Sequence, residues 1–249
     1  MRRTLFTLLF LALSITAYSQ QIIPYSYYQY QKLNRSLYSK DTRFHTSLRP
    51  VIGDDSTLTA KLDSLLIIGT DTTGKNWVIR KLFNQHLVEV NNKDYTFYLD
   101  FLPDFVIGKD REHGINTWLN TRGYQVGGTV GKKFSFYSSG FENQARFNNY
   151  LTEYINKNNI IPGMVNDKNA LASPRPDTKD WAYATAVLNY TQSKYLSITL
   201  GQDKNFIGDG YRSMLLSDVA SPYPFLRLTG TLGNVKYMAL YSQFQDPLS

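Results

Sequence analysis

Apolar and polar residues alternate along most of the chain after residue 94. In the segment 95–108, Phe97 and Leu99 fall on one face, and Tyr98 and Asp100 fall on the other. A period of two places successive side chains on opposite faces of a β-strand. The same pattern recurs over 118–130, 134–147, 181–190, 195–200, 223–232 and 235–244. The pattern therefore predicts seven antiparallel strands with one apolar and one polar face.

The connections between these strands alternate in length. Short turns are predicted near residues 132, 193 and 233, where residues such as Gly233 tolerate the positive φ of a hairpin turn. Long connections are expected at 108–116, 148–179 and 202–222, and a loop as long as 148–179 is a candidate binding element. In an antiparallel sheet all the short turns then lie at one end, as in outer-membrane barrels with short periplasmic turns and long outer loops.

The expected fold class is mainly β: a partial antiparallel outer-membrane β-barrel of about seven strands, preceded by a small helical plug. Bacterial barrels have even strand numbers of at least eight, and a seventh strand without a neighbour leaves an exposed edge. We therefore expect residues 94–249 to be an incomplete barrel and the chain to be the N-terminal part of a longer protein. The alternative is a complete eight-stranded barrel in which one strand lies in a segment assigned elsewhere.

The N-terminus has the features of an export signal. It begins with Arg2 and Arg3, continues with an apolar stretch over 5–15 and ends in a small-x-small site at Ala17 and Ser19. This organisation predicts a secretory signal peptide over the first 19 residues. The chain contains no Cys, which excludes disulfides and lipid attachment through a cysteine. Together with the barrel pattern, these features predict location in the outer membrane.

The segment 20–93 has helical rather than strand-like periodicity. Apolar spacing predicts one helix near 30–38, Ser56 is placed to cap a second that runs to about residue 66, and Asn76 is placed to cap a third that runs to Val90. Short helices before the strands indicate a plug or periplasmic segment. A small independent helical domain is the alternative.

Catalytic signatures are poor. His45, His86 and His113 lie far apart without metal-ligand spacing, and the run 53–56 only faintly resembles a hydrolase serine motif. We expect no catalytic residue, no metal and no cofactor. The formal net charge of +7 suits anionic glycans or lipopolysaccharide, but a solvated surface with a modest excess of Lys is the favoured interpretation. Nucleic acid is not an expected partner, because no compact basic patch accompanies a recognition motif.

The stretch 201–224 carries the most distinctive motif: Gly and an acidic residue, an aromatic residue, Gly-x-Gly, then Ser, Ala and Pro before the next strand. In this it resembles the Wzi-type capsule-assembly outer-membrane proteins and the related RemB-type gliding-motility outer-membrane proteins of Bacteroidetes. The residues that carry the resemblance are Gly201, Asp203, Phe206, Gly208, Gly210, Ser213, Ser217, Ala220, Pro222 and Pro224. The Wzi pattern has Trp near Phe206 and Pro at Asp209, so the chain is more similar to the gliding-motility branch, as are segments 96–105, 117–123 and 132–144.

The resemblance implies a non-enzymatic outer-membrane protein whose barrel is closed by helices. Its expected role is gliding motility, or the assembly and surface retention of capsular or other exopolysaccharide. The expected partners are outer-membrane lipid and lipopolysaccharide, capsular or extracellular polysaccharide, and gliding-machinery proteins. A porin-like channel and a polysaccharide-acting surface enzyme are the alternatives.

Six residues of the same stretch are candidate glycan ligands: Asp203, Phe206, Asp209, Tyr211, Arg212 and Tyr223. The aromatic rings would stack on sugar rings, and the charged groups would hydrogen-bond to hydroxyls, Arg212 also to acidic sugars. Asp203 and Asp209 are also the candidate acid/base pair of a glycosidase, which needs two carboxylates flanking the scissile bond. The competing interpretation is that Asp203 pairs with Lys204 or Arg212 and that the glycines only shape the loop.

Overall fold

The computed structural model describes residues 21–40, 47–53, 73–174, 176–193, 195–233 and 235–244. The predicted signal peptide, the predicted helix after Ser56, His45 and the last five residues of the chain lie outside these ranges. Their predictions are therefore neither confirmed nor contradicted.

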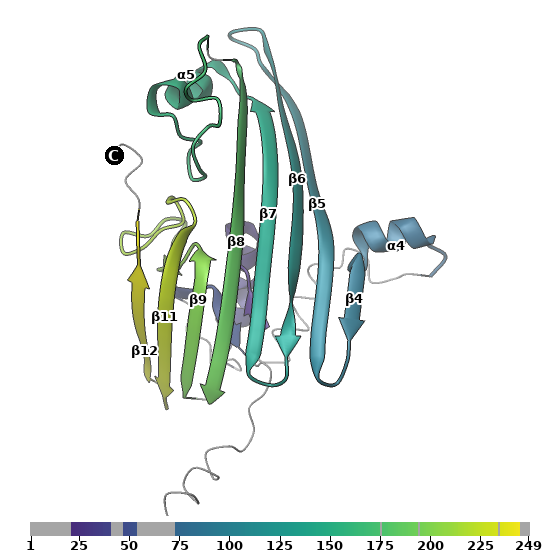
Figure 1. Ribbon diagram of the computed structural model, residues 1–249, viewed down its shortest axis with the longest axis vertical. Coiled ribbons are helices and arrows are strands. Elements are labelled where there is room, and N and C mark those ends of the chain that lie inside the picture. Colours follow the sequence, from purple (N-terminus) through teal and green to yellow (C-terminus); the bar gives the residue numbers. More distant parts are fainter. Residues whose placement is uncertain are drawn as a thin grey trace, which may run out of the picture.

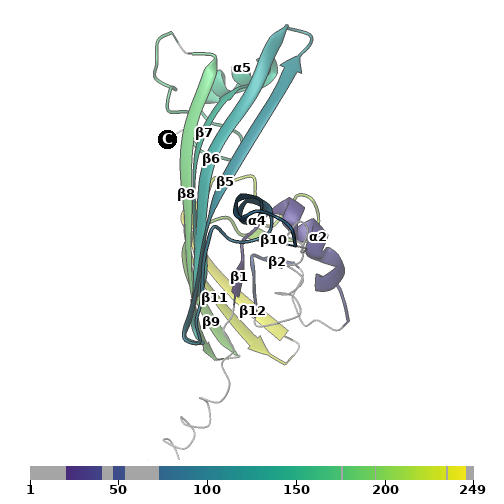
Figure 2. The same cartoon turned by 90° about the vertical axis from the view of Figure 1, so that its right-hand side faces the viewer.

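One curved antiparallel sheet dominates the structure (Figures 1 and 2). Its strand order is β12-β11-β9-β8-β7-β6-β5-β4, so each strand pairs with its neighbours along the chain. The strands are β4 (Val88–Asn91), β5 (Tyr95–Asp110), β6 (Ile115–Val130), β7 (Phe134–Arg146), β8 (Thr178–Ser193), β9 (Leu196–Asp203), β11 (Tyr223–Leu232) and β12 (Val235–Ser242). The described strands do not close into a barrel, since β4 and β12 do not pair with each other.

The seven strands predicted from the alternating pattern are all present, and β4 is an additional eighth strand. Asn76 caps α4 (Trp77–Phe83) as predicted, because its side chain accepts a hydrogen bond from the backbone N of Ile79 at 2.9 Å. The prediction that this helix runs to Val90 is wrong. Val90 lies in β4, opposite Phe97 of β5. Helical spacing and strand alternation both fit this short apolar run, and pairing with β5 decides between them.

The predicted long connection at 108–116 is also wrong. β5 and β6 remain paired as far as Asp110 and Ile115, which leaves a turn of four residues, 111–114. Gly114 adopts a φ of +67° in this turn, a conformation that glycine reaches without strain. The other turns follow the prediction. The connections at 92–94 and 131–133 lie at the lower end of the sheet in Figure 1, as do the C-terminal ends of β8 and β11.

The remaining long connections carry small elements of their own. α5 (Asn149–Asn158) lies in the β7–β8 connection, and β10 (Phe206–Ile207) lies between β9 and β11. None of the helices in the described ranges is long and apolar enough to cross a lipid bilayer.

The two faces of the sheet have opposite polarity, most clearly along β8. On one face, called here the outer face, lie Ala182, Ala184, Ala186 and Leu188, all exposed. On the other, the inner face, residues at alternate positions are buried, and several are polar, including Lys179, Thr185, Asn189 and Thr191. The outer face of the neighbouring strands is also apolar, with Phe101, Leu200 and Tyr237 exposed. The outer face is therefore apolar, whereas the inner face combines buried polar side chains with buried apolar ones such as Val187.

Polar groups on the inner face are paired across the strands. Ser139 and Thr185 hydroxyls lie 2.7 Å apart, and the side-chain oxygen of Asn189 accepts from Ser197 at 2.6 Å and Thr199 at 2.9 Å. Buried polar groups cost free energy unless they are hydrogen-bonded. Such cross-strand pairs make a polar inner face compatible with burial.

Residues 21–40 and 47–53, called here the N-terminal part, cover the inner face (Figure 2). β1 (Gln21–Ile23) pairs with β3 (Val51–Gly53), and β2 (Leu48–Arg49) pairs with β10. Between them, α2 (Tyr27–Leu37) buries Tyr30, Leu33 and Leu37, so the predicted first helix is confirmed. Ile22 joins the N-terminal part to a cluster of inner-face residues that includes Val187 and Phe225.

Gly128 is expected to be intolerant of any side chain. A Cβ at this position would lie 2.0 Å from the carbonyl oxygen of Thr96, a backbone atom that cannot move without breaking the β5–β6 pairing. We expect Gly128→Ala to lower the free energy of unfolding by about 1–3 kcal/mol. Gly230→Ala is the matched control, because its Cβ would meet no atom closer than 4.0 Å. Equal urea-unfolding midpoints for the two variants would contradict this expectation.

Candidate functional site

A cavity of about 550 Å³ lies between the N-terminal part and the inner face of the sheet. The sheet contributes aromatic rings from three strands, and the N-terminal part contributes Tyr25 and Tyr27. Hydrogen-bonding groups lie between the rings. The residues of the sheet that line the cavity are Tyr98, Leu102, Gln125, Tyr137, Ser139, Phe141, Tyr183, Thr185 and Asp203.

Two of the aromatic rings lie flat against the sheet. Tyr98 pairs across the strands with Gly127, and its ring occupies the space that a Cβ of Gly127 would take. Phe141 covers Gly123 in the same way. Because a glycine has no side chain, the neighbouring ring can fold down over it, an arrangement known from aromatic–glycine pairs in sheets. One face of each of these two rings therefore rests on the sheet.

Further ring contacts and a polar cluster hold this wall in place. Tyr183 stacks on Phe141 with ring centres 5.0 Å apart, and His86 stacks on Tyr98 at 4.5 Å. His86 Nδ1 also lies 2.7 Å from the Asp100 carboxylate, which accepts a second hydrogen bond from Gln125 at 2.9 Å. His86 thus orients an aromatic residue of the wall, and it lies after the end of α4 rather than in the helix predicted to run to Val90.

Two of the six predicted glycan ligands are buried in the protein. Phe206 is completely buried, stacked on Tyr25 at 5.4 Å and lying beneath the guanidinium group of Arg49. Tyr223 is 4% exposed, and its hydroxyl accepts a hydrogen bond from the backbone N of Asn205 at 3.0 Å. Neither ring has a free face for a ligand. Both instead join the 204–222 loop to the rest of the protein.

Three others lie on the outside of the same loop. Asp209 accepts hydrogen bonds from Tyr38 at 2.7 Å and Ser47 at 3.0 Å, which attaches the loop to the N-terminal part. Tyr211 is exposed, with its ring edge-on to Tyr27 at 4.8 Å. Arg212 forms an ion pair at 2.8 Å with Asp218, not with Asp203.

Asp203 alone of the six lines the cavity. It accepts a hydrogen bond at 2.7 Å from the backbone N of Lys204, whereas the Lys204 ammonium group donates to backbone carbonyls, including that of Asp218 at 3.0 Å. Neither predicted ion-pair partner of Asp203 therefore forms an ion pair with it. Burial lowers the pKa of Lys204, and the carboxylates of Asp218 and Asp203 oppose this shift. Burial also disfavours the charged form of Tyr25: it raises the pKa of this phenol to about 12, so the phenol stays protonated.

Sequence reasoning missed the aromatic wall of the cavity. Tyr98, Phe141 and Tyr183 are spread over almost 90 residues of sequence and look like ordinary polar-face residues of separate strands. The signal that identifies two of them is the glycine opposite each ring, and it becomes visible only when the strand register is known. The stretch 201–224 instead holds the N-terminal part against the sheet.

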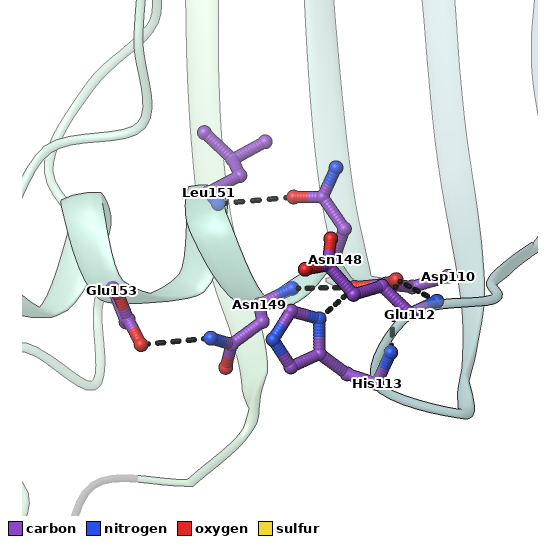
Figure 3. A network of polar contacts seen from close by, with 7 residues as sticks. All are labelled: Asp110, Glu112, His113, Asn148, Asn149, Leu151 and Glu153. Atoms are coloured by element: carbon purple, nitrogen blue, oxygen red, sulfur yellow. Dashed lines mark hydrogen bonds and ion pairs between the residues drawn. The ribbon is translucent and has the colours of Figure 1, made fainter.

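A second polar cluster joins the β5–β6 turn to α5 at the upper end of the sheet (Figure 3). Asp110 accepts from the backbone N of Asn149 at 3.2 Å and lies 3.1 Å from His113 Nδ1. The Asn148 side chain caps α5 by accepting from Leu151 N at 3.0 Å. His113 therefore has a structural partner. No group of three or more His, Cys, Asp or Glu residues within the described ranges is arranged to hold a metal ion.

Comparison of the chain with family models, with curated proteins and with solved structures gives no match.

Proposed function

We propose that this chain forms part of the wall of an outer-membrane β-barrel, with its outer face in lipid and its N-terminal part as an internal plug. The observation that supports this most is the inverted polarity of the sheet. On the outer face Leu188 is 59% exposed and Leu200 58%, whereas Asn189 and Thr199 on the inner face are at most 1% exposed. A soluble sheet with one solvated face places its polar residues on that face. In a membrane barrel the exposed face of the sheet lies in lipid, which accounts for apolar residues on that face and polar residues on the opposite one.

The strand lengths and turns agree with this proposal. A strand crosses the hydrocarbon core with about 9–11 residues. β5, β6 and β8 have 16 residues each, so they would extend beyond the bilayer at the end that carries α5. In an outer membrane the end with the short turns faces the periplasm and the other end faces the medium.

At the cell surface we propose that the protein retains or organises capsular or other extracellular polysaccharide, or supports gliding motility, without catalysing a reaction. The rings of Tyr98, Phe141 and Tyr183 line the cavity beside Gln125 and Thr185, so the lining combines the apolar surface and the hydrogen-bonding groups that a sugar ring needs. Outer-membrane lipid, lipopolysaccharide and gliding-machinery proteins are the other proposed partners.

The geometry favours a non-enzymatic role at the cell surface over the two alternatives, a polysaccharide-acting enzyme and a porin-like channel. A glycosidase needs two carboxylates on either side of the bond that it cleaves. Asp209 does not line the cavity, and Asp218, which lines it together with Asp203, is held in an ion pair at 2.8 Å with Arg212. A porin needs an open lumen, whereas α2, β1 and the 204–222 loop lie against the inner face (Figure 2).

The function is tested by deleting the gene and restoring it in variant forms. We expect the deletion strain to lose cell-bound exopolysaccharide or colony spreading, and the wild-type gene to restore it. Tyr183→Ala removes a ring of the cavity wall and is expected to restore less than a tenth of the bound polysaccharide, whereas Tyr183→Phe keeps the ring and is expected to restore most of it. Equal levels of both variants in the outer-membrane fraction exclude a folding effect.

Loss of spreading with unchanged bound polysaccharide would assign the protein to gliding. Full restoration by Tyr183→Ala would contradict the glycan site. An unchanged phenotype of the deletion strain in both assays would contradict the proposed role altogether.

A further inference from the structure

A second, smaller cavity lies under the lower half of the N-terminal part, apart from the aromatic cavity. Its floor is the inner face of β9, β11 and β12, and its roof is formed by Pro50 and β3. The strand register explains its composition. Ser197 of β9 lies opposite Thr229 of β11, and Thr231 lies opposite Lys236 of β12, so their side chains share one face with Arg227.

Arg227 is buried in this cavity without a negatively charged partner there. It is 3% exposed, and its Nη1 donates to two neutral acceptors, the carbonyl of Pro50 at 3.4 Å and the side-chain oxygen of Asn205 at 3.1 Å. Its Nε is buried and has no hydrogen-bond partner among the described residues. A buried donor of this kind costs free energy, and a buried charge costs more, unless a partner is present.

Lys236 adds a second positive charge to the same cavity. None of the described residues that line the cavity is acidic. Lys236 forms no ion pair with any acidic residue in the described part of the chain. Hydroxyl groups of Ser197, Thr229 and Thr231 complete the polar lining. Guanidinium, ammonium and hydroxyl groups around one space are the donors that bind oxyanions in proteins.

The size of the cavity limits the ligand. Its volume is about 80 Å³, whereas a single water needs roughly 10–15 Å³ measured in the same way. The space therefore accommodates roughly five to eight water-sized groups, enough for an oxyanion of five atoms but not for a sugar chain.

We propose that this cavity binds a small tetrahedral oxyanion, phosphate or sulfate, either as the free ion or as a substituent of a larger molecule. The guanidinium group of Arg227 donates from its free Nε, Lys236 supplies the second charge, and the hydroxyls bind the remaining oxygens. The bound anion neutralises the two cations and fixes the N-terminal part to β11 and β12, because Arg227 also binds the carbonyl of Pro50. This inference does not depend on the proposed function.

The test is a titration of the purified protein with sodium phosphate in detergent, against sodium chloride at equal ionic strength. We expect phosphate, and sulfate in a parallel titration, to raise the thermal unfolding midpoint in a saturable way and chloride to have no such effect. Lys236→Gln is expected to weaken phosphate binding at least tenfold in calorimetry. Lys132→Gln, at an exposed turn residue, is the control and is expected to leave the affinity unchanged.

The variant at Lys236 is chosen because it leaves the contacts of Arg227 to Pro50 and Asn205 intact, so the fold is retained. Binding of glucose 6-phosphate with the same dependence on Lys236 would identify an ester as a ligand, and its failure to bind would restrict the site to the free ion. Equal phosphate affinity of wild type and Lys236→Gln, or an equal effect of chloride, would overturn the proposal.

Discussion

Phe206→Ala is expected to release the N-terminal part from the sheet. The ring is completely buried, stacked on Tyr25 and covered by the guanidinium group of Arg49. Its loss removes these contacts and leaves a cavity, which costs about 3–5 kcal/mol for a buried phenylalanine. This destabilisation affects the docking of the N-terminal part rather than the large sheet, because Phe206 lies in β10, which pairs with β2 and not with the large sheet.

Limited proteolysis measures this effect directly. Cleavage within α2 or within the paired strands β1, β2 and β3 requires that these elements open, and every 1.4 kcal/mol changes the population of the open form tenfold. Phe206→Ala should therefore increase the cleavage rate by about two to three powers of ten. Met214→Ala is the control on the same loop, since this side chain is fully exposed. Equal cleavage rates for the two variants would show that the β2–β10 pairing and the Asp209 contacts hold the segment without Phe206.

Leu200→Arg is expected to destabilise the protein in a bilayer by about 2–4 kcal/mol, the cost of Arg on the lipid face of a barrel near the midplane. Leu200 lies on the outer face between Leu188 and Leu226 of the adjacent strands and is 58% exposed. If that face met water, a charge at so exposed a position would change stability by no more than about 0.5 kcal/mol. Lipid and water outside the sheet therefore predict clearly different changes in the free energy of unfolding for Leu200→Arg.

Urea unfolding of the protein reconstituted in lipid gives the free energy for this comparison. Gln202→Arg is the matched control, because Gln202 lies two residues further on the same strand and face and is already polar. We expect Gln202→Arg to cost less than half as much as Leu200→Arg. Equal small costs for both, or solubility of the folded protein without detergent, would contradict the membrane assignment.

The candidate site shows why a motif in one loop need not be a binding site. The six residues predicted as glycan ligands were chosen because they are close in sequence and chemically suited to sugars. In the structure only Asp203 lines the cavity, whereas Phe206 and Asp209 attach the loop to the N-terminal part. Gly208, with a φ of +150°, allows the chain to turn directly after β10. The glycine pattern of the motif thus serves a structural connection.

By itself the sequence determined the seven long strands, the apolar outer face and the short connections near residues 132, 193 and 233, but not the short β5–β6 turn at 111–114. These features are local, since side chains alternate along any extended chain and glycine permits tight turns wherever it occurs. Local pattern also placed α2 and the Asn76 cap correctly. It failed at Val88–Asn91, where the same residues fit a helix and a strand and only pairing with β5 stabilises the strand.

Only the tertiary structure decided which residues meet. The flat ring of Tyr98 over Gly127, the burial of Phe206 against Tyr25, and the shared cavity of Arg227 and Lys236 all depend on strand register or on the docking of the N-terminal part. A shift of strand register by a single residue would turn Tyr98, Arg227 or Lys236 to the opposite face of the sheet. Contacts between segments far apart in the chain are set by the free energy of the whole fold, and no local pattern encodes them.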